Sequence, residues 1–220
     1  MLEMPDFEVM FQAGTRLRWK DGSQSTIDVR TVGELLLPSG RLIAQDPDVA
    51  EHEEPFSAPL PPGKYVVSLS ISHWETSPNP GLPSPLRLVN AARIEIGDMP
   101  PVSWEMALRG NEDLTDLDED GFFGFGVDSG CGAFFDVGAL PYLKQMQPDD
   151  DSPLVKALDR LDEAGGLVVP TGDERLNIIV FQCGMGDGAY PTWIGRSENG
   201  DMVCLISDLE LFTSCEVMPL

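Results

Sequence analysis

Turn-forming residues interrupt this chain so often that long helices are disfavoured as its main element. The 220 residues include 22 glycines and 19 prolines, which together make up nearly a fifth of the chain. Glycine tolerates left-handed backbone conformations and proline lacks an amide donor, so both mark turns between elements. The pattern predicts many short elements, with 42% hydrophobic residues available to build a core.

Alternation of apolar and polar side chains predicts where the strands lie. Residues 67–72 alternate Val, Leu and Ile with three serines, which is typical of a strand with one buried face. Residues 91–96 also have strand character, and we expect them to pair with residues 67–72. Residues 16–20 and 27–30 alternate around Asp21 and Gly22, which predicts a basic β-hairpin.

Two helices are predicted in the second half of the chain. Asp136 precedes an apolar segment and suits a helix N-cap. Ser152 and Pro153 are typical of a helix start, and Gly165 is typical of a helix end. We therefore predict a single domain over residues 1–220 with a β-rich α+β fold, a mainly antiparallel sheet or sandwich with two short helices in the C-terminal half.

The charge of the chain excludes two classes of partner. Lys and Arg number 14 against 37 acids, which gives a net charge of −23. Nucleic acids and anionic membranes both require clusters of basic side chains, so neither is an expected partner. An acidic chain attracts basic proteins and cations, although the same charge also serves solubility.

The expected location is the cytoplasm. Glu3 and Asp6 occupy the region where a signal peptide carries basic residues. The longest apolar runs are also far shorter than a membrane span.

Common cofactor and metal motifs are absent from the sequence. The four cysteines (Cys131, Cys183, Cys204 and Cys215) form no C-x-x-C pair, and they are expected to be buried free thiols, with Cys131 set apart by its glycine turn. There is no phosphate-binding loop, nucleophile elbow, H-E-x-x-H motif or dinucleotide fingerprint. We therefore expect no cofactor and no dedicated metal site.

An acidic run at residues 111–121 partly resembles a calcium-binding loop. Asp116, Asp118 and Asp120 precede Gly121 with the spacing of the first half of an EF-hand. Val127 occupies the position where an EF-hand has its bidentate glutamate, so the second half of the run does not match the motif. The run is predicted to be a solvated acidic turn, and cation binding stays open.

A glycine-rich loop at residues 184–191 separates two apolar runs. It carries Gly184, Gly186, Asp187, Gly188 and Tyr190. We interpret it as a tight loop that exposes its backbone at the rim of a sheet. A simpler interpretation is that Asp187 and Gly188 turn a β-hairpin.

Several short motifs follow one another along the chain in a characteristic order. They comprise Gly40, Asp46 and Pro47; Pro62, Gly63, Tyr65 and Val67; Arg93; Trp104, Glu105, Met106 and Ala107; Val127, Asp128, Gly130 and Asp136; and the glycine-rich loop. In order and spacing the chain resembles the bacterial family catalogued as domain of unknown function 4241, over residues 33–210. The basic hairpin (residues 1–32) lies outside this resemblance. The family has no established activity, so the resemblance implies a shared fold and site but no reaction.

The acidic composition favours a protein-interaction module. Such a chain could bind a basic partner as immunity proteins bind toxins, with charge steering followed by aromatic anchors. Candidate anchors next to loops are Phe56, Trp74, Tyr190 and Trp193. The glycine-rich loop is then the predicted contact with the partner.

The alternative is a carboxylate- or metal-dependent, hydrolase-like enzyme. Six acids lie in or beside the motifs: Asp46, Glu105, Asp128, Asp136, Asp187 and Asp208. If several converge, they could hold a cation or form an acid/base pair. The candidate catalytic residues are Asp187, Asp128, Asp136 and Glu105, and an enzyme requires that they share one cleft.

Overall fold

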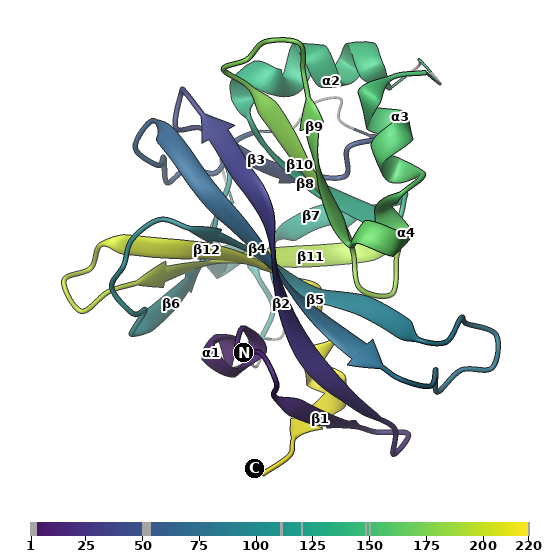
Figure 1. Cartoon of the computed structure of the whole chain (residues 1–220). Helices are drawn as coiled ribbons and strands as arrows, with labels where there is room; N and C mark the ends of the chain where they lie inside the picture. Colours follow the sequence, from purple (N-terminus) through teal and green to yellow (C-terminus); the bar gives the residue numbers. More distant parts are fainter. Residues whose placement is uncertain are drawn as a thin grey trace.

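The computed structural model describes residues 4–49, 54–110, 112–119, 121–147, 149 and 151–219. These residues form two antiparallel sheets with a few short helices, which confirms the β-rich α+β prediction (Figure 1). None of the helices in these ranges is long and apolar enough to cross a membrane.

The larger sheet has nine strands. In spatial order they are β13 (Cys215–Val217), β1 (Arg16–Trp19), β2 (Gln24–Leu37), β4 (Gly63–Trp74), β5 (Leu86–Glu95), β12 (Met202–Asp208), β11 (Gly188–Arg196) and β6 (Ser103–Met106). The ninth strand, β7 (Gly124–Val127), pairs with the first half of β11, while β6 pairs with its second half. The sheet twists strongly, so β11 and β12 run across the direction of β2 and β4 (Figure 1).

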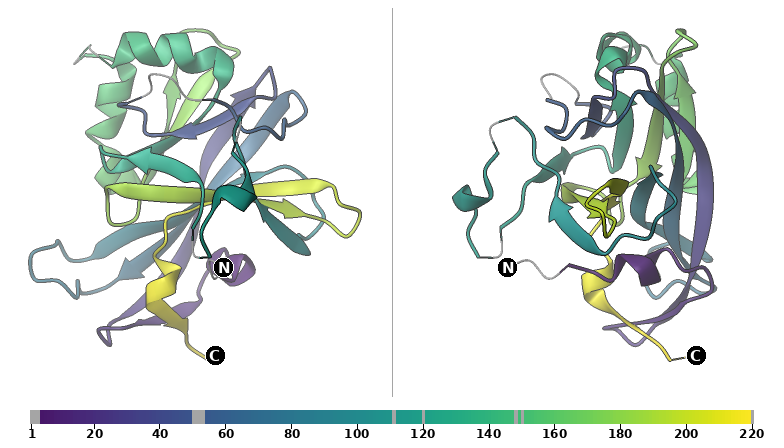
Figure 2. Two further views of the ribbon diagram at one scale, coloured as in Figure 1. Left: turned by 180° about the vertical axis from the view of Figure 1, so that it is seen from behind. Right: turned by 90° about the vertical axis from the view of Figure 1, so that its left-hand side faces the viewer.

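The smaller sheet has the strand order β3 (Leu42–Gln45), β8 (Cys131–Asp136), β10 (Asn177–Gln182) and β9 (Gly166–Pro170). Its outer face is covered by α2 (Leu140–Met146), α3 (Pro153–Leu158) and α4 (Leu161–Ala164) (Figures 1 and 2). The apolar side chains of α2, α3 and α4 pack on this face around Phe135, Ile178 and Val180.

The main core lies between the two sheets. Phe134 and Phe181 of the smaller sheet pack with ring centroids 4.8 Å apart, and they belong to one buried cluster with Leu69 and Leu205 of the larger sheet. Each such side chain contributes on the order of 2 kcal/mol on burial. A third cluster packs α1 (Phe7–Met10) on the opposite face of the larger sheet.

The amide side chain of Asn177 links the two sheets. Asn177, at the start of β10, donates to the carbonyl oxygen of Glu34 at 2.7 Å and accepts from the amide of Leu36 at 2.9 Å. Both partners lie on β2, whose other edge pairs with β4. The long β2 strand is thus held from both sides.

Several local predictions are confirmed. Residues 67–72 and 91–96 lie largely in the paired strands β4 and β5. The N-terminal hairpin forms, with the carboxylate of Asp21 accepting from the amide of Ser23 in the turn. The carboxylate of Asp136 caps the turn η2 (Val137–Ala139), which leads into α2.

The structure also corrects the sequence predictions in three places. The helix predicted from Ser152 divides into α3 and α4, which ends at Gly165. The short helix α1 was not predicted, although Asp6 caps it. Asp187 and Gly188 do not turn a hairpin, because β10 and β11 belong to different sheets.

The acidic run projects into solvent. In the right-hand view of Figure 2, the segment with η1 (Leu114–Asp116) stands away from both sheets. Asp113 caps this turn by accepting from the amide of Thr115. Asp120, a member of the partial EF-hand pattern, lies outside the described residues.

Replacing Gly40 with alanine should destabilise the fold far more than the same change at Gly22. Both have positive φ, +71° and +84°, so alanine strains either one. A Cβ at Gly40 would also lie 2.0 Å from the carbonyl oxygen of Leu60, whereas a Cβ at Gly22 meets nothing within 4 Å. We expect losses of about 3 kcal/mol and about 1 kcal/mol, measured by urea unfolding. Equal losses would show that the contact with Leu60 relaxes freely.

Candidate functional site

Two glycine turns meet where the chain passes from one sheet to the other. One joins β7 to β8 through Gly130, and the other is the glycine-rich loop between β10 and β11. The amide of Cys183 donates to the carbonyl oxygen of Gly130 at 3.0 Å. A Cβ on Gly130 would lie 3.9 Å from the Cα of Gly186, and both glycines have positive φ. The sequence motifs around Gly130 and Gly186 are therefore neighbours in space.

Asp46 holds the turn between β7 and β8 in place through hydrogen bonds. Its carboxylate is fully buried and accepts from the amides of Asp128 at 2.8 Å and Ser129 at 2.7 Å. It also accepts from the hydroxyl of Ser129 at 2.7 Å and from the amide of Asp48 at 2.8 Å. Charge-assisted bonds of this kind are strong in a buried position, so Asp46 is a structural anchor.

Tyr190 holds the second turn. Its hydroxyl donates to the carbonyl oxygen of Gly186 at 2.7 Å, and its ring lies 6.1 Å from that of Phe125. Burial raises the pKa of Tyr190 to about 12. The predicted anchors Phe56, Trp74 and Trp193 are buried as well, so all four proposed anchors pack inside the protein and are not exposed to a partner.

The six acids do not share one cleft. Asp136 lies at the far end of β8 from the glycine turn, where it accepts from Ser39 and Gly138. Glu105 accepts from the guanidinium of Arg196 at 2.8 Å. Asp128 and Asp187 are exposed on the two glycine turns. Over the described ranges, no three His, Cys, Asp or Glu side chains are placed to hold a metal ion.

Asp208 is the acid most perturbed by its surroundings. Burial raises the pKa of its carboxyl to about 7, although the amide of Glu210 donates to it at 2.9 Å. Glu210 has a φ of +56°, which is unusual for a residue with a side chain. The segment after β12 also packs on the glycine-rich loop, since a Cβ on Gly184 would lie 2.9 Å from the carbonyl oxygen of Leu209.

A cleft of about 850 Å³ opens beside the glycine-rich loop. Gly184, Met185 and Gly186 form one wall, and Ser129, Gly130 and Cys131 continue it. The segment of residues 82–88 and two helical leucines, Leu158 and Leu161, also line the cleft. Met185 is 70% exposed at the tip of the loop. The glycine-rich loop thus borders this cleft.

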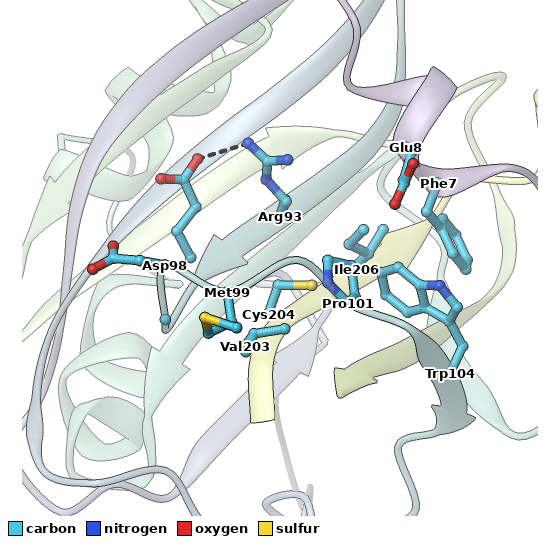
Figure 3. Close-up of a pocket in the computed structure, with 12 residues that line it drawn as sticks. Phe7, Glu8, Arg93, Asp98, Met99, Pro101, Trp104, Val203, Cys204 and Ile206 are labelled. Carbon is cyan, nitrogen blue, oxygen red and sulfur yellow. Dashed lines mark hydrogen bonds and ion pairs between the residues drawn. The ribbon is translucent and has the colours of Figure 1, made fainter. Parts of the chain in front are cut away.

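A second cavity, of about 300 Å³, was not anticipated from the sequence. It lies on the outer face of the larger sheet, between α1, β5, β6 and β12 (Figure 3). The rings of Trp104 and Phe7 lie 4.4 Å apart along one side, and Arg93 stands on the other (Figure 3). Arg93 and Trp104 both occur in the motifs that support the family resemblance, which is the signal that could have revealed this cavity.

The polar groups of the second cavity are mostly acidic. Glu8, Glu95 and Asp98 line it together with Arg93. Arg93 donates to Glu95 at 2.7 Å and lies 4.3 Å above the ring of Phe11, so its charge is already balanced. Two acids therefore remain without a cationic partner among the described side chains of the cavity. We call this cavity the acidic pocket.

The cysteines behave as small apolar side chains. Cys131, Cys183 and Cys204 are buried, and Cys215 is half-buried; all four are free thiols. Burial raises the pKa of Cys131 and Cys204 to about 11 and that of Cys183 well above its usual range. Such thiols are poor nucleophiles.

Comparison with known proteins identifies the family. The family model described as "Protein of unknown function (DUF4241)" matches residues 35–207. The chain belongs to this family. The DUF4241 region spans both sheets from the end of β2 to β12, and it excludes α1, β1 and β13. No curated protein and no solved structure gives a significant match.

Asp46→Asn should destabilise the protein, whereas Asp187→Asn should not. An asparagine amide in place of the Asp46 carboxylate cannot accept every bond that the carboxylate accepts, and its own N–H group would face amide donors, so we expect a loss of about 2 kcal/mol. Asp187 is exposed, and its replacement should change the free energy of unfolding by less than about 0.5 kcal/mol. Urea unfolding measures both variants. A similar loss in both would contradict the anchoring role of Asp46.

Because of Asp208, the free energy of unfolding should fall as the pH rises from about 4 to about 7. The unfolded chain releases the Asp208 proton near pH 4, whereas the folded chain holds it until its pKa of about 7, so protons favour folding in this window. Asp208→Asn removes this dependence and can still accept from the amide of Glu210. Relative to the unmodified chain, the variant should gain on the order of 2 kcal/mol between about pH 4.5 and about pH 8. Parallel urea-unfolding profiles of the two proteins against pH would refute the assignment.

Proposed function

We propose that this DUF4241 protein is a protein-binding module that docks a basic partner at the acidic pocket. The observation that carries the proposal is the combination of an aromatic wall, unpaired carboxylates and exposed apolar side chains at one place. Met99, on the rim of the pocket, is 55% exposed, and the nearby Val102 is 63% exposed. Exposed apolar side chains beside a cavity are typical of interaction sites.

The chemistry of the pocket suits a lysine or arginine side chain. Glu8 lies beside Phe7 and across the cavity from Met99 (Figure 3). A basic side chain that enters the pocket would find the carboxylates of Glu8 and Asp98 and the ring of Trp104, which favours a cation over its face. Its aliphatic stem would contact Met99.

The charge of the whole protein supports the same class of partner. A net charge of −23 steers a basic protein toward the surface and repels an acidic one. Aromatic and apolar contacts would then provide the stable part of the complex. This mode of binding resembles the way immunity proteins neutralise toxins, so an immunity-like role remains part of the proposal.

Two earlier predictions remain untested: that the glycine-rich loop contacts a partner, and that the protein is an enzyme. Gly184, Gly186, Asp187, Gly188 and Tyr190 lie in or beside the wall of a different cleft. The hydrolase-like alternative needs carboxylates free for chemistry, but Asp46 and Asp136 already accept several hydrogen bonds each. No specific arrangement of the described acids favours it.

Photo-crosslinking in the native host tests the docking site. A photoreactive residue in place of Met99 should capture a basic protein, while the same residue in place of Val168, which is 40% exposed on the smaller sheet, should not. Charge reversal by Glu8→Lys with Asp98→Lys should abolish capture, because it removes the attraction for a cation. The matched control, Asp159→Lys with Glu174→Lys, changes the net charge equally and should retain capture. Capture of an acidic protein, or equal loss in both double variants, would overturn the proposal.

A further inference from the structure

We propose that this protein also binds a small amphipathic anion, with its oxyanion group held by Arg30, His73 and Arg87 and its apolar chain in the cleft beside the glycine-rich loop. This inference goes beyond the proposed function and uses the opposite face of the larger sheet. The ligand class is an unbranched apolar chain that ends in a carboxylate or a phosphate.

The first observation is a concentration of basic side chains in an acidic protein. A cavity of about 180 Å³ lies between β2, β4, β5 and α4, next to Gly165. Arg30, His73 and Arg87 line it, with Asp28 as the one acid among its lining residues. His73 and Arg87 are directly opposed across β4 and β5. The chain has 14 Lys and Arg residues against 37 acids, so two arginines against one acid at one cavity create a locally positive site.

The second observation is that these groups have hydrogen-bonding capacity to spare. The Nε2 atom of His73 is buried and has no hydrogen-bond partner in the described part of the chain. Arg87 forms no ion pair with any described residue, and Arg30 donates one of its N–H groups to the carbonyl oxygen of Ala164. An unsatisfied buried polar atom is costly, and an oxyanion could accept from both guanidinium groups and from Nε2 when this atom carries a proton.

The third observation is that the basic cavity and the large cleft are neighbours. Arg87 and Gln182 line both. Beyond them the cleft is walled by apolar side chains: Leu82, Pro83, Pro85, Leu86, Leu88, Leu158, Leu161 and Met185. Arg87 is the one charged side chain among the described residues that line this cleft.

The two cavities together define the ligand. A molecule that places its oxyanion between the arginines would lead its remaining atoms past Arg87 into the apolar cleft. Burial of each methylene group in such a cleft adds to the affinity. A purely inorganic anion would use the basic cavity alone, and a cationic amphiphile would meet two arginines at the head position.

Calorimetric titration of the full chain tests the inference with four probes. Decanoate and decyl phosphate supply the two possible head groups, decyltrimethylammonium supplies the same chain with a cation, and inorganic phosphate supplies an anion without a chain. We expect at least one decyl anion to bind at least about tenfold more tightly than the ammonium compound and inorganic phosphate. The preferred decyl anion identifies the head group.

Variants locate the head group. Arg87→Gln and Arg30→Gln should each weaken binding of the preferred anion at least about tenfold, since each removes a charge-assisted bond. Arg18→Gln, at an exposed position of β1, is the matched control and should leave affinity unchanged. Equal affinity for the anionic and cationic probes, or equal effects of Arg87→Gln and Arg18→Gln, would overturn the inference. Charge reversal at Glu8 and Asp98 should not alter anion binding. The test of anion binding is therefore independent of the docking proposal.

Discussion

The arrangement of the chain around the glycine-rich loop depends on the hydrogen bonds that the buried carboxylate of Asp46 accepts. Asp46 follows β3 of the smaller sheet and accepts hydrogen bonds from the turn that leads out of β7 of the larger sheet. That turn carries Gly130, against which the glycine-rich loop rests. Two of the four connections between the sheets, β7 to β8 and β10 to β11, pass this junction, and their glycines allow the close approach. The composition of the loop is thus largely explained by the geometry of a sheet-to-sheet connection.

The larger sheet offers different chemistry on its two faces. Its outer face carries the acidic pocket under α1, where aromatic rings lie beside carboxylates. Its inner face carries a basic cavity that shares Arg87 and Gln182 with a neighbouring apolar cleft. A net charge of −23 describes the long-range field of the protein, but individual sites at contact distance depend on the few side chains around them. The two faces can therefore suit ligands of opposite charge.

Elements with local sequence signals were predictable from the amino-acid sequence alone. The alternation at residues 67–72, the turn at Asp21 and Gly22, and the caps at Asp136 and Ser152 all depend on neighbours a few residues away, and each forms as predicted. The motif order also identified the family. The acidic composition followed directly from counting residues.

The pairing of strands into sheets and the grouping of side chains into sites depend on long-range contacts, which the sequence pattern does not record. The loop at Asp187 and Gly188 has the composition of a hairpin turn, yet β10 pairs with β8 and β9 in the smaller sheet while β11 pairs with β12 in the larger sheet. Asp46 could not be recognised as an anchor, since its partners at Asp128 and Ser129 lie more than eighty residues away. The acidic pocket combines α1, β5, β6 and β12, and no local periodicity records such long-range pairing, because register across a sheet is set by burial and hydrogen bonding in the assembled fold.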